Sequence, residues 1–181
     1  MKVMIASDIH GSSCYCGKMM ERYAEEKPDK LLLLGDLLYH GPRNDLPDLY
    51  DTKKVIEMLN SIREKILCVC GNCDCDVDQM VLEFPILADY GFLSVDGVDI
   101  YATHGHVINQ NKPLPGLRGI LLCGHTHVPK IEECDGFVYL NPGSVSIPKN
   151  GSRHSYMIFE NGTFFWKDLE SKEVYMEYEA K

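Results

Sequence analysis

Leu31-Leu32-Leu33-Leu34-Gly35-Asp36 is the stretch that decides the fold, because four consecutive leucines end abruptly at a glycine and a carboxylate. The run is too short and too apolar for a surface helix, and it suits a strand buried in a parallel sheet. Residues 3–6 and 66–70 are similar apolar runs, and each is also followed by polar residues. We therefore expect three buried strands with polar side chains at their carboxyl ends.

Helical patterns separate these three strands. Residues 15–26 can form a first helix, and apolar residues recur at helical spacing from Val55 to Ile62. Asp51 or Thr52 is a plausible N-cap of the second helix. The order strand, helix, strand, helix, strand predicts a parallel sheet with right-handed crossovers.

The second half of the chain has a different pattern, dominated by hairpin signals. Asp96-Gly97, Asp135-Gly136 and Asn161-Gly162 each lie between apolar or aromatic runs, and such dipeptides favour type I′ turns. Leu121-Leu122-Cys123 adds another buried strand. We expect one domain over residues 1–181, with two sheets packed together and helices outside. The strands expected in this half are residues 92–95, 98–103, 121–123, 130–134, 137–141, 155–159 and 163–168.

Charge and composition exclude several classes of protein. The 181-residue chain has a formal net charge of -9 and no cluster of Lys and Arg, which argues against nonspecific binding to nucleic acid. No apolar run approaches the roughly 20 residues of a membrane span. The first strand reaches charged Asp8 too early for a signal peptide. We therefore expect a cytoplasmic protein.

The eight cysteines do not indicate a disulfide framework, because nothing in the sequence indicates export. Cys70 and Cys73 have the spacing of a redox or zinc pair. Cys68 and Cys70, however, alternate in an apolar run, which favours small core residues of a strand. We expect reduced thiols, and a zinc or redox role for Cys68, Cys70, Cys73 and Cys75 remains an alternative.

Residues of types that bind metals, namely Asp, Asn and His, directly follow several of the expected strands. In open α/β sheets, ligands bind beyond the carboxyl ends of strands, so these side chains are expected to converge. Any one of them alone is weak evidence, but their common position at strand ends is not. The candidate ligands are Asp8, His10, Asp36, Asn72, His104, His125 and His127.

The donor set favours certain metals and substrates. Two carboxylates, an amide and four imidazoles, with no thiolate, suit Mn²⁺, Fe²⁺, Zn²⁺ or Ni²⁺ better than Ca²⁺ or a structural zinc ion. Two divalent ions carry four positive charges, of which Asp8 and Asp36 neutralise two. A centre that stays positive in an acidic protein favours an anionic substrate such as a phosphate ester, and two such ions can activate water for attack on it.

The motifs Asp8-Ile9-His10, Gly35-Asp36, Gly71-Asn72-Cys73-Asp74, His104-Gly105-His106 and Gly124-His125-Thr126-His127 resemble those of the calcineurin-like metallophosphoesterase superfamily. Residues 40–44 and 141–146 make the chain similar to its small bacterial members, the YfcE-type phosphodiesterases.

The resemblance implies a four-layer α/β/β/α sandwich and an enzyme that hydrolyses small phosphodiesters with a hydroxide activated by two metals. Mn²⁺ is the first choice of cofactor. It also implies that Asp8, His10 and His127 hold one ion. Asn72, His104 and His125 would hold the other, and Asp36 would bridge the two.

Cys73 departs from the superfamily pattern, which has a His at this position that can protonate the leaving group. A neutral thiol is a poor acid near pH 7, and general-acid catalysis contributes typically 10²–10⁴-fold. We therefore predict a preference for activated, aryl-type leaving groups over alkyl ones.

Other residues near the motifs have two readings each. Asp74 orients Asn72 in catalysis or caps a following helix. His106 faces the substrate or ends a turn. Arg43 contacts phosphate through its fork of donors or lies on the surface. Residues 141–144 build a turn beside the site or take part in the chemistry. The aromatic stretch 164–166 alternates in burial if it is a strand, and it is also a candidate for a dimer contact.

Three other functions remain as alternatives. The chain resembles a retromer subunit that shares this fold and acts as a binding scaffold, although the metal motifs of that subunit are degraded. A phosphomonoesterase or nuclease of the same superfamily is the second alternative, and a cysteine-based redox or zinc-sensing protein is the third.

Overall fold

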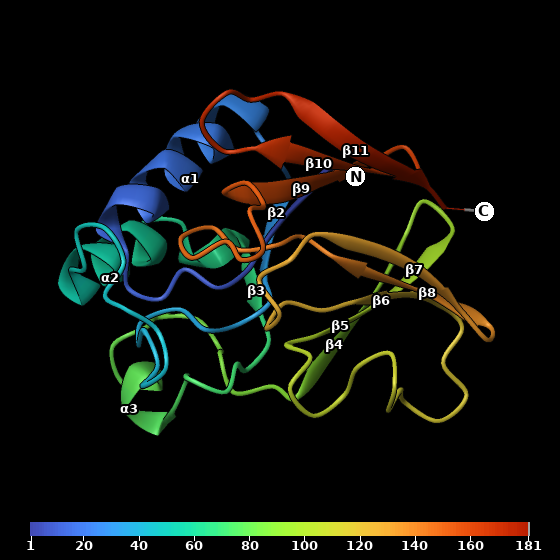
Figure 1. The fold of residues 1–181 in the computed structure, drawn as a ribbon, viewed down its shortest axis with the longest axis horizontal. Coiled ribbons are helices and arrows are strands. Elements are labelled where there is room, and N and C mark those ends of the chain that lie inside the picture. The colour runs from blue at the N-terminus through green and yellow to red at the C-terminus, as the bar shows by residue number, and fades with distance from the viewer. Residues whose placement is uncertain (181) are drawn as a thin grey trace.

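Two mixed β-sheets pack face to face in the computed structural model, which describes residues 1–180 (Figure 1). One sheet has six strands in the order β11-β10-β9-β1-β2-β3, and the other has five in the order β4-β5-β6-β8-β7. The strands are β1 Val3–Ala6, β2 Lys30–Leu33, β3 Ile66–Cys68, β4 Tyr90–Val95, β5 Val98–Thr103, β6 Gly119–Leu122, β7 Lys130–Cys134, β8 Phe137–Asn141, β9 Ser155–Glu160, β10 Thr163–Asp168 and β11 Val174–Glu179.

The parallel unit expected from the leucine run is confirmed. β2 pairs in parallel with β1 on one side and with β3 on the other, with Met4 opposite Leu31 and Leu32 opposite Leu67. Residues 31–34 of the leucine run are all buried. The carboxyl ends of these three strands therefore meet at one edge of the sheet.

The three hairpins are also confirmed, since β4–β5, β7–β8 and β9–β10 are antiparallel pairs joined by the expected dipeptides. Asp96 and Gly97 both have positive φ, as do Asn161 and Gly162, which a type I′ turn requires. In the turn between β7 and β8, Gly136 has positive φ but Asp135 does not, so the type I′ prediction is wrong there. Each hairpin thus begins and ends where the sequence places its turn.

Three helices and a short 3₁₀ helix connect the strands: α1 Ser13–Glu26, α2 Thr52–Asn60, η1 Arg63–Lys65 and α3 Asp76–Gln79. Ser12 caps α1 by accepting a hydrogen bond from the Tyr15 N–H, and Asp51 caps α2 through the Lys54 N–H. Of the two predicted caps for the second helix, Asp51 is therefore the residue used. The first helix begins two residues before its predicted start.

The apolar side chains form three layers of core. One lies between the helices and the six-stranded sheet and includes Met19, Val55 and Leu33. A second lies between the sheets and includes Ile5, Ile100 and Trp166. The third covers the outer face of the five-stranded sheet, where Leu114 and Leu117 pack on Leu121, Phe137 and Tyr139.

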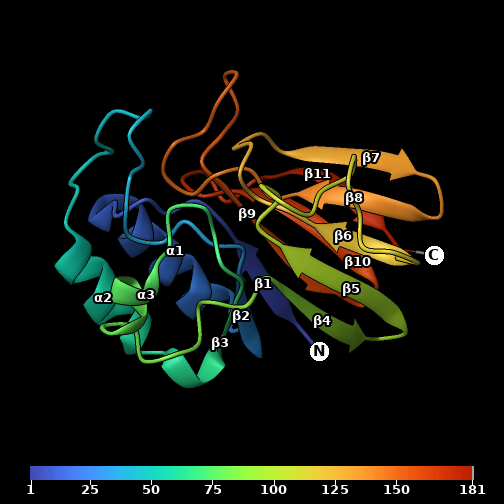
Figure 2. The same ribbon diagram turned by 90° about the horizontal axis from the view of Figure 1, so that it is seen from below.

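Two mixed sheets with flanking helices are thus confirmed, with one difference from a symmetric sandwich. Among residues 1–180, α1 and α2 pack on the six-stranded sheet, and no helix lies between β4 and β11 (Figures 1 and 2). Residues 114 and 117 belong to the loop that covers the other sheet, so a loop occupies the place of the second helical layer.

The edges of the six-stranded sheet differ from the sequence prediction. β11 is not predicted, because Val174–Glu179 contains two glutamates and lacks an uninterrupted apolar run. β3 ends at Cys68 rather than at residue 70, because the Cys70 N–H bonds to the Ala88 carbonyl and leaves the ladder. No helix in residues 1–180 is long and apolar enough to cross a membrane.

The aromatic stretch of β10 alternates in burial as a strand should. Phe164 and Trp166 are fully buried between the sheets, whereas Phe165 is only half-buried on the other face. The Trp166 indole N–H donates to the Asn141 carbonyl oxygen of β8 at 2.7 Å, which joins the two sheets by a hydrogen bond. Phe164 and Trp166 are therefore part of the core and are not available for a subunit contact.

We predict that Trp166→Phe lowers the free energy of unfolding by about 1–3 kcal/mol, because the buried Asn141 carbonyl loses its donor. Urea unfolding with a chelator present throughout measures this change without a metal contribution. Phe92→Leu serves as the control, since Phe92 is 53% exposed, and its effect should stay below about 1 kcal/mol. Equal effects of the two substitutions would contradict a specific role for the indole hydrogen bond.

Candidate metal centre

The seven predicted ligands all follow strands, and they meet at one end of the sandwich. Asp8 and His10 follow β1, Asp36 follows β2, and Asn72 follows β3; His104 follows β5, and His125 and His127 follow β6. Five of the seven have positive φ: Asp8, His10, Asp36, His125 and His127. Such left-handed backbone is uncommon outside glycine and typically marks a functional site.

Close packing of the backbone brings these loops together. A Cβ on Gly71 would overlap the Asp36 carboxylate, and one on Gly124 would overlap the Ser7 hydroxyl. Glycine is therefore needed at both positions, which explains why Gly71-Asn72 and Gly124-His125 occur as pairs. The Asp8 N–H also donates to the Gly35 carbonyl at 3.1 Å, which joins the loops after β1 and β2.

The first group of side chains is Asp8, His10 and His127, all of them buried. The two imidazole Nε2 atoms are 3.3 Å apart. The Asp8 Oδ1 atom lies 3.6 Å from Nε2 of His10 and 3.3 Å from Nε2 of His127. Three ligand atoms thus converge on one point.

The second group is built around Asp36, Asn72 and His104. Nε2 of His104 lies 3.4 Å from the Asp36 carboxylate and 3.1 Å from the Asn72 amide oxygen. The Asp36 carboxylate also lies 3.6 Å from Nε2 of His10 in the first group. His125 is next to this group, with its ring centroid 5.1 Å from that of His104. Asp36 therefore stands between the two groups.

The hydrogen bonds of the imidazoles show that the site suits metal ions. Nδ1 of His10, His104 and His127 lies 2.6–2.8 Å from a backbone carbonyl oxygen, which can only accept, so each Nδ1 carries a proton. In the neutral rings, the Nε2 lone pairs then point at one another and at carboxylates. The Asp8 Oδ1 atom is buried without any hydrogen-bond partner. A cation satisfies all of these acceptors at once, and His held by carbonyls in this way is typical of metal ligands.

The charges respond to burial and to each other. Burial opposes ionisation of Asp8, yet contact with His10 and His127 holds the pKa of its carboxyl well below the usual value. Burial alone would lower the pKa of His104, but the Asp36 carboxylate raises it to about 9. Without metal, the imidazole therefore binds a proton where a cation would otherwise lie, so metal binding should release protons.

Asp74 makes backbone contacts that the sequence does not predict. Its carboxylate accepts hydrogen bonds at 2.8 Å from the backbone N–H groups of Gly71, Asp36 and Leu37. It forms no hydrogen bond with the Asn72 side chain, and α3 is capped by Cys75 with Asp78 instead. The capping prediction is therefore wrong. Asp74 joins the loop after β2 to the loop after β3.

The turn at residues 141–146 does lie beside the site, as predicted, and it holds the Asp8 backbone. The hydroxyls of Ser144 and Ser146 both donate to the Asp8 carbonyl, at 2.8 and 3.1 Å. The Asn141 amide donates to the Gly124 carbonyl at 2.7 Å. The sequence does not predict these contacts, because residues 141–146 carry no local signal for which distant segment they pack against.

The remaining candidates lie around the mouth of the centre. A cavity beside the ligands is lined by Arg43, Asn72 and Cys73, among others. The Asn72 amide donates to Cys73 Sγ at 3.2 Å. Burial, followed by the nearby Asp36 carboxylate, raises the pKa of the Cys73 thiol to about 12. His106 is exposed, with its ring centroid 5.3 Å from that of His104 and 6.2 Å from that of His125.

The cysteines do not assemble into a cluster of their own. All eight are free, and Cys16 and Cys123 are fully buried. Among residues 1–180, no group of potential metal ligands contains more than one cysteine, and the single case is Cys73 beside His10 and Asp36. The alternative of a cysteine-rich zinc site is therefore wrong.

Comparison with known proteins agrees with this geometry. Residues 1–163 match the family model described as the calcineurin-like phosphoesterase superfamily domain. The chain belongs to the calcineurin-like phosphoesterase superfamily. Within the superfamily, it is 44% identical over 162 residues to phosphodiesterase YfcE of Escherichia coli K12, an alignment that covers 89% of this chain and 88% of that protein. It is 26% identical over 151 residues to a phosphodiesterase of Methanocaldococcus jannaschii, covering 79% and 83% of the two chains.

Two solved structures show the same fold. The structure of YfcE, a phosphoesterase from E. coli, has a TM-score of 0.96 and 40% sequence identity, and both chains are covered completely. Vacuolar protein sorting 29 from Cryptosporidium parvum has a TM-score of 0.64 and 20% identity, over 98% and 97% of the two chains. At that identity, the second likeness shows the fold alone.

We predict that Asp74→Asn weakens metal binding by about tenfold or more. An amide has one acceptor oxygen, and its NH₂ group would face a backbone N–H, which leaves a buried donor unpaired at a cost of about 1–3 kcal/mol. Titration of the metal-free protein with Mn²⁺, followed by calorimetry, measures the change. Asp76→Asn is the matched control, because Asp76 is exposed in the same segment. An unchanged Mn²⁺ affinity would show that the three N–H bonds do not position Asp36.

Proposed function

We propose that the protein is a metal-dependent phosphodiesterase. The observation that carries this proposal is the position of Asp36 between two groups of ligand atoms, at 3.6 Å from His10 Nε2 and 3.4 Å from His104 Nε2. A carboxylate shared between two sets of donors suits a pair of divalent ions better than a single ion. The names of the E. coli and M. jannaschii relatives support a diester as the substrate.

In this proposal, Asp8, His10 and His127 would hold one ion, whereas Asn72, His104 and His125 would hold the other. Asp36 would be a ligand of both. When bound, such a pair of ions polarises the phosphoryl oxygens and provides a nucleophilic hydroxide near neutral pH. The protein supplies the fixed positions of the donors, because carbonyl oxygens orient three of the imidazoles through Nδ1.

Three further side chains act on the substrate rather than on the ions. Arg43 lines the cavity beside the ligands, where its guanidinium binds phosphoryl oxygens. His106 would face the substrate from beside His104 and His125. Cys73 occupies the place from which the superfamily's usual His protonates the leaving group. A thiol with a raised pKa holds its proton too firmly for this role, which supports a preference for aryl leaving groups.

The donor set and the composition support the finer parts of the proposal. Oxygen and imidazole ligands without thiolate make Mn²⁺ the first choice, with Ni²⁺, Fe²⁺ and Zn²⁺ as alternatives. Free cysteines throughout the chain support a reducing compartment, and therefore the cytoplasm. The net charge of -9 argues against nonspecific binding of nucleic acid, so a small phosphodiester is the proposed substrate.

We predict that the Mn²⁺-reconstituted protein hydrolyses bis(p-nitrophenyl) phosphate and that Asp36→Asn lowers kcat at least 10²-fold. The substitution removes one negative charge and one ligand oxygen from the position between the two groups. Release of p-nitrophenolate measures the rate, and metal analysis of both proteins shows how many ions each retains. Retained activity in Asp36→Asn would rule out a shared-carboxylate centre.

The same assay separates the alternatives. Faster hydrolysis of p-nitrophenyl phosphate than of the diester would make the protein a phosphomonoesterase. Absence of both metal and activity would favour a binding scaffold, the class suggested by the retromer subunit.

We predict that Cys73→His raises kcat/KM for diesters with alkyl leaving groups by roughly 10²-fold and changes the rate for p-nitrophenyl diesters much less. An imidazolium can protonate a basic alkoxide, whereas p-nitrophenolate leaves without help. Comparison of alkyl and aryl diesters under saturating Mn²⁺ measures the ratio. Cys75→His is the matched control, because Cys75 is exposed at the start of α3. An unchanged ratio in Cys73→His would contradict the role assigned to residue 73.

A further inference from the structure

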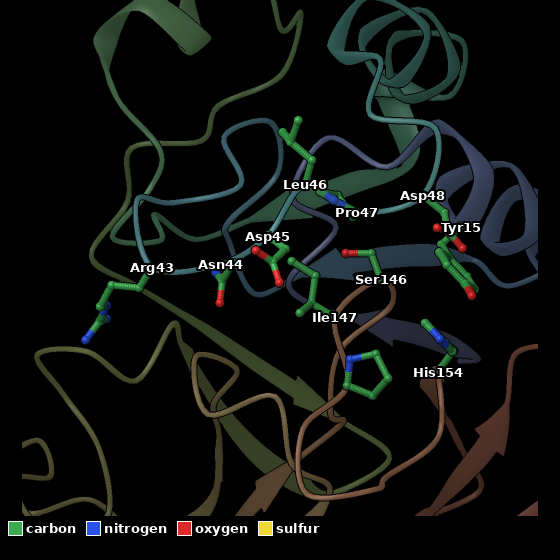
Figure 3. Close-up of a pocket in the computed structure, with 11 residues that line it drawn as sticks. Tyr15, Arg43, Asn44, Asp45, Leu46, Pro47, Asp48, Ser146, Ile147 and His154 are labelled. Atoms are coloured by element: carbon green, nitrogen blue, oxygen red, sulfur yellow. The ribbon is translucent and has the colours of Figure 1, made fainter.

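A cavity of about 450 Å³ lies beside the metal centre and has no part in the chemistry described above (Figure 3). Three segments line it: Tyr15 of α1, residues 43–48, and a third segment that includes residues 146–148 and 154. Its volume lies within the range of small-molecule sites. It shares Arg43 and Asn44 with the smaller cavity that the metal ligands line, so the two spaces adjoin.

Hydrogen bonds connect the floor of this cavity to the ligands. The Ser146 hydroxyl donates to the Asp8 carbonyl at 3.1 Å, and His127 Nδ1 donates to the Ile147 carbonyl at 2.6 Å. Arg43, the proposed phosphate contact, lies at the opposite end of the lining from Tyr15 and His154 (Figure 3). An organic group esterified to a phosphate at the metal centre can therefore extend past Arg43 into the cavity.

The loop from 43 to 48 is fixed at both ends, so the cavity is a formed site. At one end, the Asn44 amide donates to the His40 carbonyl at 2.8 Å. At the other, the hydroxyl of Ser12 donates to the Asp48 carbonyl at 2.7 Å. On the facing wall, the Tyr15 and His154 rings stack, with centroids 3.8 Å apart and planes inclined by 7°.

The polar groups that line the cavity include donors, such as the Arg43 guanidinium, and several acceptors. His154 Nδ1 donates to the Val145 carbonyl at 2.8 Å, so Nε2 of the neutral ring can only accept. The carboxylates of Asp45 and Asp48 form no hydrogen bond or ion pair with any other residue of the range 1–180. Asp45 and Asp48 both belong to the loop of residues 43–48 that lines the cavity (Figure 3). These acceptors favour a ligand with several donors, and the two carboxylates disfavour a second anionic group.

The rest of the lining is apolar and consists of Leu46, Pro47, Ile147 and Pro148. A ligand that offers hydroxyl donors at its rim and C–H groups on its faces matches both kinds of wall. Sugars have this chemistry, either free or as the ribose of a nucleoside. A long alkyl chain would leave the acceptors without donors.

We propose that this cavity binds the alcohol group that stays on the phosphate after hydrolysis, and that this group is a sugar or a nucleoside. The inference rests on the proposed phosphodiesterase function. Water loses a proton and attacks phosphorus, and the P–O bond to the other alcohol breaks. That group leaves with the electron pair as an oxyanion, and it takes up a proton from solvent when it is basic enough. The product that remains is a sugar or nucleoside monophosphate.

The test uses diesters that share the p-nitrophenyl leaving group and differ only in the retained group: methyl, glucose, uridine or choline. With Mn²⁺-loaded protein, we expect kcat/KM for the glucose or the uridine diester to exceed that for the methyl diester at least tenfold. The double variant Asp45→Asn with Asp48→Asn should lower kcat/KM for the better of the glucose and uridine diesters about tenfold, because hydrogen bonds to charged groups are lost. The methyl diester does not reach the cavity, so its rate should stay within about twofold.

Asp135→Asn is the matched control, because Asp135 is an exposed carboxylate in the β7–β8 turn outside this cavity. Binding of uridine monophosphate and of glucose phosphate, measured by calorimetry, gives a readout that does not need turnover. The double variant should weaken the better of the two by a similar factor. The glucose and uridine arms together decide whether the sugar is recognised alone or within a nucleoside.

Several results would overturn the inference. A loss of equal size on the methyl diester would show a general structural effect, and sugar diesters no better than the methyl diester would show that the cavity recognises no sugar. A choline diester that is preferred and depends on Asp45 and Asp48 would make the cavity a cation site. If none of the four diesters is hydrolysed, the proposed function itself is contradicted. The cavity inference is then tested separately by binding, and unchanged affinity of the double variant for the monophosphates would overturn it.

Discussion

The three hydrogen bonds to Asp74 are the contact on which the centre depends. A single carboxylate accepts the N–H groups of Asp36, Leu37 and Gly71, and so fixes the ends of β2 and β3 relative to each other. Burial raises the pKa of this carboxyl, so its negative charge is stabilised mainly by those backbone donors. Asp36 is the residue that the two ligand groups share. Its backbone is therefore fixed by Asp74, which is not itself a proposed ligand.

The rest of the centre follows the same logic of indirect support. Carbonyl oxygens of residues 34, 39 and 147 set the tautomers of three imidazoles, and serine hydroxyls from the turn after β8 hold the Asp8 carbonyl. Such contacts do not occupy the metal-binding atoms, and they restrict the conformations of the side chains and backbone that carry those atoms. The donors are thus arranged before any cation arrives, which lowers the free-energy cost of assembling the site.

Much of this fold can be read from the sequence because its signals are local. The leucine run, the glycine that follows it and the Asp-Gly and Asn-Gly dipeptides determine buried strands and tight turns through nearby residues alone. The positions of the ligands could be predicted for the same reason, since each one follows a strand. β11 could not, because it contains two glutamates and its pairing with β10 depends on a neighbour rather than on its own pattern. The contacts of Asp74 and of residues 141–146 were beyond reach because they join segments far apart in the chain.

Five of the proposed ligands have left-handed backbone, and this restricts which amino acids can occupy their positions. Outside glycine, Asp, Asn and His are the residue types that adopt this conformation most readily, and the same three types make up the donor set here. A glutamate or a cysteine at residue 8, 10, 36, 125 or 127 would meet backbone strain in addition to its different reach. The backbone conformation and the metal thus restrict these positions to the same few residue types. Changing the metal preference of this scaffold by exchanging ligands would therefore require rebuilding the loops that carry them.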